Sequence, residues 1–210
     1  MIRDLIADDH AVVRRGVRQI LEETSEFIAA GEATSGQDTL QQVRSGQFDI
    51  VLLDISMPDR SGLEILHTLH DLYPRLRVLI LSVYPEEQYA VRVLKAGAAG
   101  YLTKDSAPEE LITALRKVSQ GGRYVSAALA EKLAADLVDG PARSGLEALS
   151  DREVQVFTLL AGGKTVSEAA DEMALSVKTV STYRTRILQK MDLHSTAELV
   201  RYALDHHLIL

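Results

Sequence analysis

The sequence predicts an α/β fold with a five-stranded, doubly wound parallel sheet, followed by a small all-α region of four helices that contains a helix-turn-helix. Over the first ~120 residues, short aliphatic runs alternate strictly with amphipathic stretches, which indicates a parallel sheet covered by helices on both faces. After a segment of Gly, Pro and Ser at 139–145, only the helical period remains. The predicted organisation is a first domain over 1–122, a linker helix and flexible linker over 123–146, and a second domain over 147–210.

Each predicted strand is a short aliphatic run. The run at 49–55 (DIVLLDI) is almost unbroken, as expected for a strand that is buried on both faces of a parallel sheet. The five predicted strands are Ile2–Ala7, Phe27–Gly31, Asp49–Ile55, Arg77–Ser82 and Tyr101–Thr103.

The stretch after each predicted strand has the apolar spacing of a helix. Val13, Val17 and Leu21 lie on one stripe of the first helix, and Ser35 is expected to cap the second. The other predicted helices of this part are 62–72, 88–96 and 109–119, and a further helical pattern covers 126–138 in the linker.

The C-terminal part carries repeated helix-start signals. A hydroxyl residue is followed three residues later by Glu at Ser150, Thr165 and Ser195, which is the spacing of a capping box, and Ser176 is expected to cap one more helix. The middle two helices, at 165–174 and 177–191, are separated by only a short turn, as in a helix-turn-helix.

Composition excludes several classes of protein. Hydrophobic residues make up 46% and charged residues 25% of the 210, an ordinary globular mixture that excludes disordered and fibrous chains. The chain has no cysteine, which excludes disulfides, thiolate metal sites and cysteine nucleophiles. No apolar run approaches the ~18 residues of a membrane span, so we expect a cytoplasmic protein with no membrane partner.

Charge is distributed unevenly. The net charge is −7, yet the stretch 173–191 contains four basic residues and no acidic one. A local basic stripe on a helix in an acidic chain is typical of nucleic-acid binding, and the alternative is an ordinary solvated helix face.

Polar side chains follow four of the predicted strands. Asp8 and Asp9 follow the first, Asp54 lies at the end of the third, Ser82 ends the fourth and Lys104 follows the fifth. The carboxyl ends of parallel strands meet at one edge of a sheet, where ligands bind. Three neighbouring carboxylates repel one another unless a cation lies among them, and oxygen ligands suit Mg²⁺. The alternative is that each aspartate merely caps a helix.

The segments LIADDH (5–10) and LLDISMP (52–58), together with Ser82, Tyr101 and Lys104, resemble the receiver domain of two-component response regulators, which has a flavodoxin-like fold. Many receivers have proline after the lysine, where this chain has Asp105. The resemblance covers residues ~1–120 and implies that Asp54 accepts a phosphoryl group from a sensor histidine kinase.

The same resemblance implies roles for the neighbouring residues. Asp9 and Asp54 would bind Mg²⁺ directly, Asp8 through water, and the backbone carbonyl of Ser56 would be a further ligand. Lys104 would pair with the phosphoryl oxygens. Ser82 would hydrogen-bond to them, and Tyr101 would turn inward as the second switch residue.

The segments 149–156 (LSDREVQV) and 176–180 (SVKTV) resemble the DNA-binding domain of NarL/LuxR/FixJ-type regulators. The resemblance implies that the helix at 177–191 enters the major groove of double-stranded DNA. It assigns base contacts to Ser181, Thr182 and Thr185, and we expect phosphate contacts from Lys178, Thr179, Arg184, Arg186 and Lys190. The family often has Lys and His where this chain has Ser181 and Tyr183, so no DNA target sequence can be carried over.

The resulting hypothesis is a phosphorylation-controlled transcription regulator, not an enzyme, that forms a homodimer on phosphorylation, with RNA polymerase as a further candidate partner. Two alternatives remain. One is a regulator of the same architecture that binds DNA independently of phosphorylation. The other is a Mg²⁺-dependent phosphatase with Asp54 as nucleophile, which is disfavoured because Ser56 stands where such enzymes usually have a second carboxylate.

Overall fold

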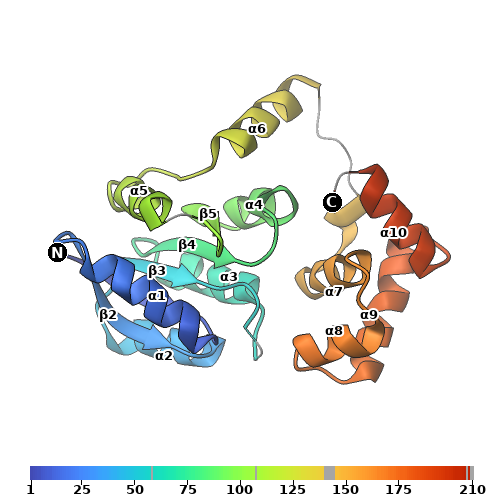
Figure 1. The fold of residues 1–210 in the computed structure, drawn as a ribbon, viewed down its shortest axis with the longest axis horizontal. Coiled ribbons are helices and arrows are strands. Elements are labelled where there is room, and N and C mark those ends of the chain that lie inside the picture. Colours follow the sequence, from blue (N-terminus) through green and yellow to red (C-terminus); the bar gives the residue numbers. More distant parts are fainter. Residues whose placement is uncertain (58, 107, 140–144, 207, 209–210) are drawn as a thin grey trace. The chain divides into compact units, whose positions relative to one another are not determined.

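The computed structural model describes residues 1–57, 59–106, 108–139, 145–206 and 208 (Figure 1). Within it the chain forms two compact units, Met1–Leu133 and Ala134–Leu210. Residues 140–144 of the predicted flexible linker lie outside the described residues. The domain limits near residues 122 and 147 therefore stay a prediction.

The first unit is built on a five-stranded parallel sheet with the order β2-β1-β3-β4-β5, which confirms the predicted fold (Figure 1). β2 continues two residues beyond the predicted end at Gly31, and β3 is shorter than predicted. The strands are β1 (Ile2–Ala7), β2 (Phe27–Ala33), β3 (Ile50–Leu53), β4 (Arg77–Ser82) and β5 (Gly100–Thr103).

A helix follows each strand, as the alternating pattern predicts. α4 begins at Glu86, two residues before the predicted start at Gln88, and Ser35 caps α2 by accepting the Asp38 N–H. The helices are α1 (Ala11–Glu22), α2 (Gly36–Ser45), α3 (Gly62–Leu72), α4 (Glu86–Lys95), α5 (Pro108–Ser119) and the linker helix α6 (Ala127–Asp139).

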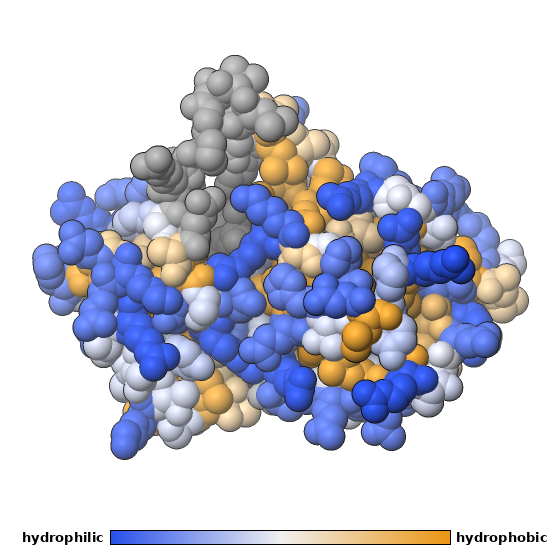
Figure 2. All heavy atoms as spheres, turned by 180° about the vertical axis from the view of Figure 1, so that it is seen from behind, coloured by the Kyte–Doolittle hydropathy of each residue, from blue (hydrophilic) through white to orange (hydrophobic). Residues whose placement is uncertain are grey.

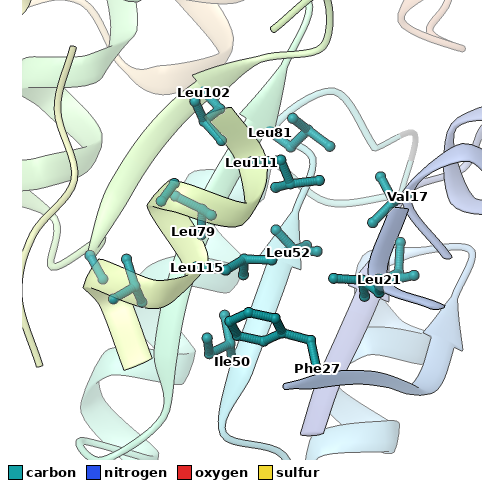
Figure 3. Close-up of a cluster of buried hydrophobic side chains, with 14 residues drawn as sticks. Val17, Leu21, Phe27, Ile50, Leu52, Leu79, Leu81, Leu102, Leu111 and Leu115 are labelled. Atoms are coloured by element: carbon teal, nitrogen blue, oxygen red, sulfur yellow. The ribbon is translucent and has the colours of Figure 1, made fainter. Parts of the chain in front are cut away.

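α1 and α5 pack on the same face of the sheet. Figure 3 shows Val17 and Leu21 of α1 and Leu111 and Leu115 of α5 around the aliphatic residues of the central strands, such as Leu52. These side chains are buried, and removing apolar surface from water is the main stabilising contribution to such a core. α3 contacts α2 away from this cluster and is itself buried along its apolar side.

One buried residue of this unit, Asp4, has an ionisable side chain. Asp4 lies in β1 and shares the strand face of Ile6, because residues two apart point to the same side. It is 0% exposed, and neither carboxylate oxygen has a hydrogen-bond partner among the described residues. Burial, with a smaller contribution from Asp49, raises the pKa of Asp4 to about 8. Asp4 is therefore a destabilising residue within the core.

From Gly145 on, the described part of the second unit contains the four predicted α-helices, preceded by a short 3₁₀ turn at Gly145–Ala148. α7 packs against α9 and α10, and α8 packs against α9. Val154, Phe157 and Ile187 are among its buried residues. The helices are α7 (Asp151–Ala161), α8 (Val166–Glu172), α9 (Val177–Lys190) and α10 (Thr196–Asp205).

Helix caps fix these boundaries. The predicted capping boxes at Ser150 and Thr165 are both present. In the third predicted box, Ser195 caps α10 as expected by accepting the Glu198 N–H. The Glu198 carboxylate, however, accepts the N–H of His194 (2.8 Å) instead of that of Ser195. α8 ends before the predicted residue Ala174, whose φ of 52° is left-handed and incompatible with continuing the helix.

The surface drawn in Figure 2 carries polar side chains over most of its area, with small separate apolar patches. Among the described residues, every helix is too short or too polar to cross a bilayer.

Candidate functional site

The carboxyl edge of the sheet brings the predicted polar residues together. The backbone of Asp54 is fixed beside β1, since its N–H donates to the Ala7 carbonyl (2.8 Å). The backbone of Lys104 is fixed beside β4, since its N–H donates to the Ser82 carbonyl (2.8 Å). β1, β3, β4 and β5 are consecutive neighbours in the sheet, so residues separated by almost 100 positions converge on one site.

The side chain of Lys104 joins two of the three predicted aspartates. Its Nζ lies 2.8 Å from Asp54 Oδ2 and 2.6 Å from Asp8 Oδ2, and both carboxylates are almost completely buried. Burial raises the pKa of Asp54, and Lys104 opposes part of that rise. Burial alone would lower the pKa of Lys104, but the two carboxylates outweigh it and raise that pKa.

The same edge fits a divalent cation. Asp8, Asp9, His10 and Asp54 place ligand atoms within 4.8 Å of one another. Lys104 pairs with two of the three carboxylates, which leaves negative charge at this edge that a cation would neutralise. The oxygen donors are those that Mg²⁺ prefers. The predicted ligand Ser56 lies beside them, with its N–H donating to Asp54 Oδ1 (3.0 Å).

Sequence reasoning did not include His10 in this group. Its Nδ1 lies 2.8 Å from Asp9 Oδ1 and 3.2 Å from Asp8 Oδ1. The imidazole is 60% exposed at the start of α1. Its position directly after two aspartates was the available signal.

Asp59 and Gly62, which follow β3, both lie close to the backbone of neighbouring segments. The Asp59 carboxylate accepts the backbone N–H groups of Gly36 and Gln37, both at 2.8 Å, at the N-terminus of α2. Burial acts against the charged form, but these hydrogen bonds lower the pKa of Asp59. A Cβ at Gly62 would lie 2.6 Å from the Asp54 carbonyl oxygen, so only glycine permits this close return of the chain.

The two predicted switch residues meet through a third residue. Ser82 is buried and its Oγ accepts the Tyr84 N–H (3.2 Å), while the Tyr101 hydroxyl donates to the Tyr84 carbonyl (2.7 Å). Tyr101 is 1% exposed, so its ring lies inward, and burial raises the pKa of its hydroxyl. The ring of Tyr84 stacks on Tyr89, with centroids 4.8 Å apart. Tyr84 was not among the residues predicted for this site.

The outward face of α9 carries six of the eight predicted DNA-contact residues. Val180 and Ile187 are buried and hold the opposite face in the core of the unit. Five of these six residues are exposed. The sixth, Thr179, is partly buried, and its hydroxyl lies 2.8 Å from the hydroxyl of the capping residue Ser176. The six are Lys178, Thr179, Ser181, Thr182, Thr185 and Arg186.

The other two predicted contacts have partners within the unit. Arg184 Nε donates to the Thr196 hydroxyl at the start of α10 (2.7 Å). Lys190 Nζ lies 2.6 Å from Oε2 of the buried Glu153 in α7. Both side chains therefore connect α9 to neighbouring helices, and neither connection was visible in the sequence.

Two family models match the chain in the order of its two units. Residues 5–116 match the response regulator receiver domain, and residues 147–203 match the bacterial regulatory proteins of the luxR family. The chain is 36% identical to the response regulator UvrY of Escherichia coli K12, over 99% of this chain and 96% of that protein. It is also 36% identical to the response regulator GacA of Pseudomonas aeruginosa, over 100% and 98%.

Solved structures give the same result. RcsB of Salmonella enterica serovar Typhimurium, bound to the promoter rprA with the phosphomimetic BeF₃⁻, matches with a TM-score of 0.66 at 25% identity, covering 96% of this chain and 97% of that chain. ChrA, the response regulator of a heme-sensing two-component system, matches with a TM-score of 0.53 at 29% identity, covering 99% and 98%.

A receiver domain joined to a helix-turn-helix defines a DNA-binding transcription regulator rather than an enzyme. The chain belongs to the response regulators of two-component systems, in the group with a LuxR-type DNA-binding domain.

Proposed function

We propose that Asp54 accepts a phosphoryl group from a sensor histidine kinase and that this event controls DNA binding by α9. The observation that supports the proposal most strongly is the position of Asp54 at the carboxyl edge of the sheet, beside Asp8 and 2.8 Å from the Lys104 ammonium. Nucleophile, cation site and charge-stabilising lysine are thus within one small region, which is what phosphoryl transfer requires.

Each residue then has a defined task. A carboxylate oxygen of Asp54 attacks phosphorus, the P–N bond of the kinase phosphohistidine breaks, and the imidazole leaves. Asp9, Asp54 and the Ser56 carbonyl would hold Mg²⁺, with Asp8 acting through water, and the bound ion would supply neutralising positive charge. Lys104 exchanges its contact with the Asp54 carboxylate for one with the phosphoryl oxygens.

The switch would start at Ser82. Its hydroxyl accepts the Tyr84 N–H and also hydrogen-bonds with Tyr101, and on phosphorylation it would turn its proton to a phosphoryl oxygen. The inward Tyr101 is held by the Tyr84 carbonyl. Phosphorylation thereby favours one arrangement of the segment after β4, and a charge added at Asp54 biases a two-state element.

DNA binding would use the exposed surface of α9. Ser181, Thr182 and Thr185 lie on its exposed face, where hydroxyl groups can meet base edges, and Lys178 and Arg186 are free to approach phosphates. Two copies on paired half-sites fit the helix-turn-helix geometry, so a homodimer is the proposed binding species. RcsB has been solved as two dimers bound to two parallel DNAs. We place the protein in the cytoplasm, with RNA polymerase as a further partner.

The proposal is tested by selecting bound genomic DNA and then measuring its affinity by gel shift, with and without an acyl-phosphate donor. Wild-type protein should bind more tightly with the donor, and Asp54→Asn should not respond. Equal affinity in all four samples would support the alternative, a regulator that binds DNA independently of phosphorylation.

A further inference from the structure

The chain leading into α6 is fastened to the first unit by contacts with three elements. Tyr124 pairs with β5, since its N–H donates to the Ala99 carbonyl (2.8 Å) and it bridges to Gly100. The Tyr124 hydroxyl donates to Glu110 of α5 (2.8 Å). Two residues later, Ser126 contacts Glu86, the first residue of α4. The start of α6 is thus fixed to the same region that contains the switch residues.

Ser126 is the residue on which α6 begins. Its Oγ accepts the Leu129 N–H (3.1 Å) and its carbonyl accepts the Ala130 N–H (3.0 Å), so it caps the helix. Its own N–H donates to Glu86 Oε1 (3.2 Å), and its hydroxyl donates to Glu86 Oε2. The carboxylate therefore holds the capping hydroxyl in the orientation in which its lone pairs face α6.

Glu86 is only two residues from Tyr84, the residue that both switch side chains contact. Ser82 holds the Tyr84 N–H and Tyr101 holds the Tyr84 carbonyl. Between Tyr84 and Glu86 stands Pro85, whose ring fixes φ and limits how far the two neighbours can move independently. A displacement of Tyr84 would therefore shift the start of α4.

We propose that Glu86 is a positioning residue that transmits the state of Ser82 and Tyr101 to the N-terminus of α6 through Ser126. The inference rests on the proposed function, because it requires phosphorylation at Asp54 to stabilise the segment after β4. Tyr101 lies inward in this structure, the orientation that the phosphorylated state would favour. The contact between Glu86 and Ser126 is present together with the inward Tyr101, and phosphorylation would make it more persistent and the first turn of α6 more stable.

Amide hydrogen exchange of the full-length chain tests this, with and without Mg²⁺ and beryllofluoride as the acyl-phosphate mimic. In wild-type protein, exchange in peptides covering 127–133 should become several-fold slower on adding the mimic. Glu86→Ala should abolish this difference, and Glu86→Gln, which keeps one acceptor oxygen, should retain part of it. The matched control is Glu109→Ala on the exposed face of α5, which should respond like wild type.

Peptides around Asp54 report separately on binding of the mimic. If they become protected while 127–133 does not, or if Glu86→Ala responds like wild type, the role of Glu86 is refuted and the proposed function stands. If Asp54 itself shows no response, the proposed function fails and the inference fails with it. A folding defect in Glu86→Ala would be visible as faster exchange throughout the sheet. In that case Glu86→Gln is compared with wild type, and its response to the mimic should be smaller than that of wild type.

Discussion

Lys104 Nζ lies 2.8 Å from Asp54 Oδ2, and the same nitrogen lies 2.6 Å from Asp8. All three side chains are at most one tenth exposed, so the lysine is the shared counterion of two carboxylates that have little access to water. The group that would stabilise a transferred phosphoryl therefore already neutralises charge on the two buried carboxylates.

Replacing Lys104 with Met should be strongly destabilising in the absence of divalent cations. Removing one partner of a buried ion pair typically costs about 3–5 kcal/mol, because a charge is left buried and unpaired. Added Mg²⁺ should recover part of the loss in the variant, since it neutralises the same carboxylates. Urea unfolding with and without Mg²⁺ measures both effects.

The matched control for that experiment is Lys95→Met, at the exposed end of α4. We expect a change in unfolding free energy within about 0.5 kcal/mol. A Lys104→Met variant as stable as this control would show that the lysine is not the counterion of the site.

Asp4 should make the stability of the first unit depend on pH. Its pKa is raised from 3.8 to about 8 in the folded chain, so the folded state retains a proton that the unfolded state loses. The contribution of Asp4 to stability is therefore highest below pH ~4, falls by up to about 1.4 kcal/mol per pH unit, and levels off above pH ~8. Asp4→Asn should remove this contribution, and should unfold at higher urea concentration than wild type at pH 8.

Unfolding curves at several pH values measure the effect as the difference between wild type and variant, with the exposed Asp71→Asn as control. The difference should grow from acidic to neutral pH for Asp4→Asn only. A constant difference across this range would mean that Asp4 titrates normally.

Lys178 and Lys190 should give different results on substitution by Met, although both are basic residues of α9. Lys178 is exposed, and if it contacts a phosphate its loss should reduce the slope of log affinity against log salt by about 0.9 without changing stability. Lys190 pairs with the buried Glu153, so its loss should destabilise the second unit instead. Salt-dependent binding and thermal unfolding separate the two roles. The reverse result would place Lys190, rather than Lys178, on the DNA.

Parallel topology made much of this site predictable. Asp54 and Lys104 each follow a strand, and the rule that such positions meet at one sheet edge needs no side-chain detail. Helix starts were also predictable, because the cap at Ser35 depends on only four consecutive residues.

The relationships that were missed depend on tertiary contact. Lys190 and Glu153 are 37 residues apart on different helices, and Glu86 and Ser126 are 40 apart. No local pattern marks such a pair, since it forms only when packing has fixed both backbones and rotamers. The burial of Asp4 was not predicted, because buried strand positions usually hold apolar residues. Its burial follows from the helices that cover this face of the sheet.

The central claim is that Asp54 is the residue that becomes phosphorylated, and intact-mass spectrometry tests it most directly. Wild-type protein incubated with Mg²⁺ and a small acyl-phosphate donor should gain the mass of one phosphoryl group, and omission of Mg²⁺ should prevent the gain. Asp54→Asn should gain none under the same conditions. The same single phosphoryl group on wild type and Asp54→Asn would contradict the account.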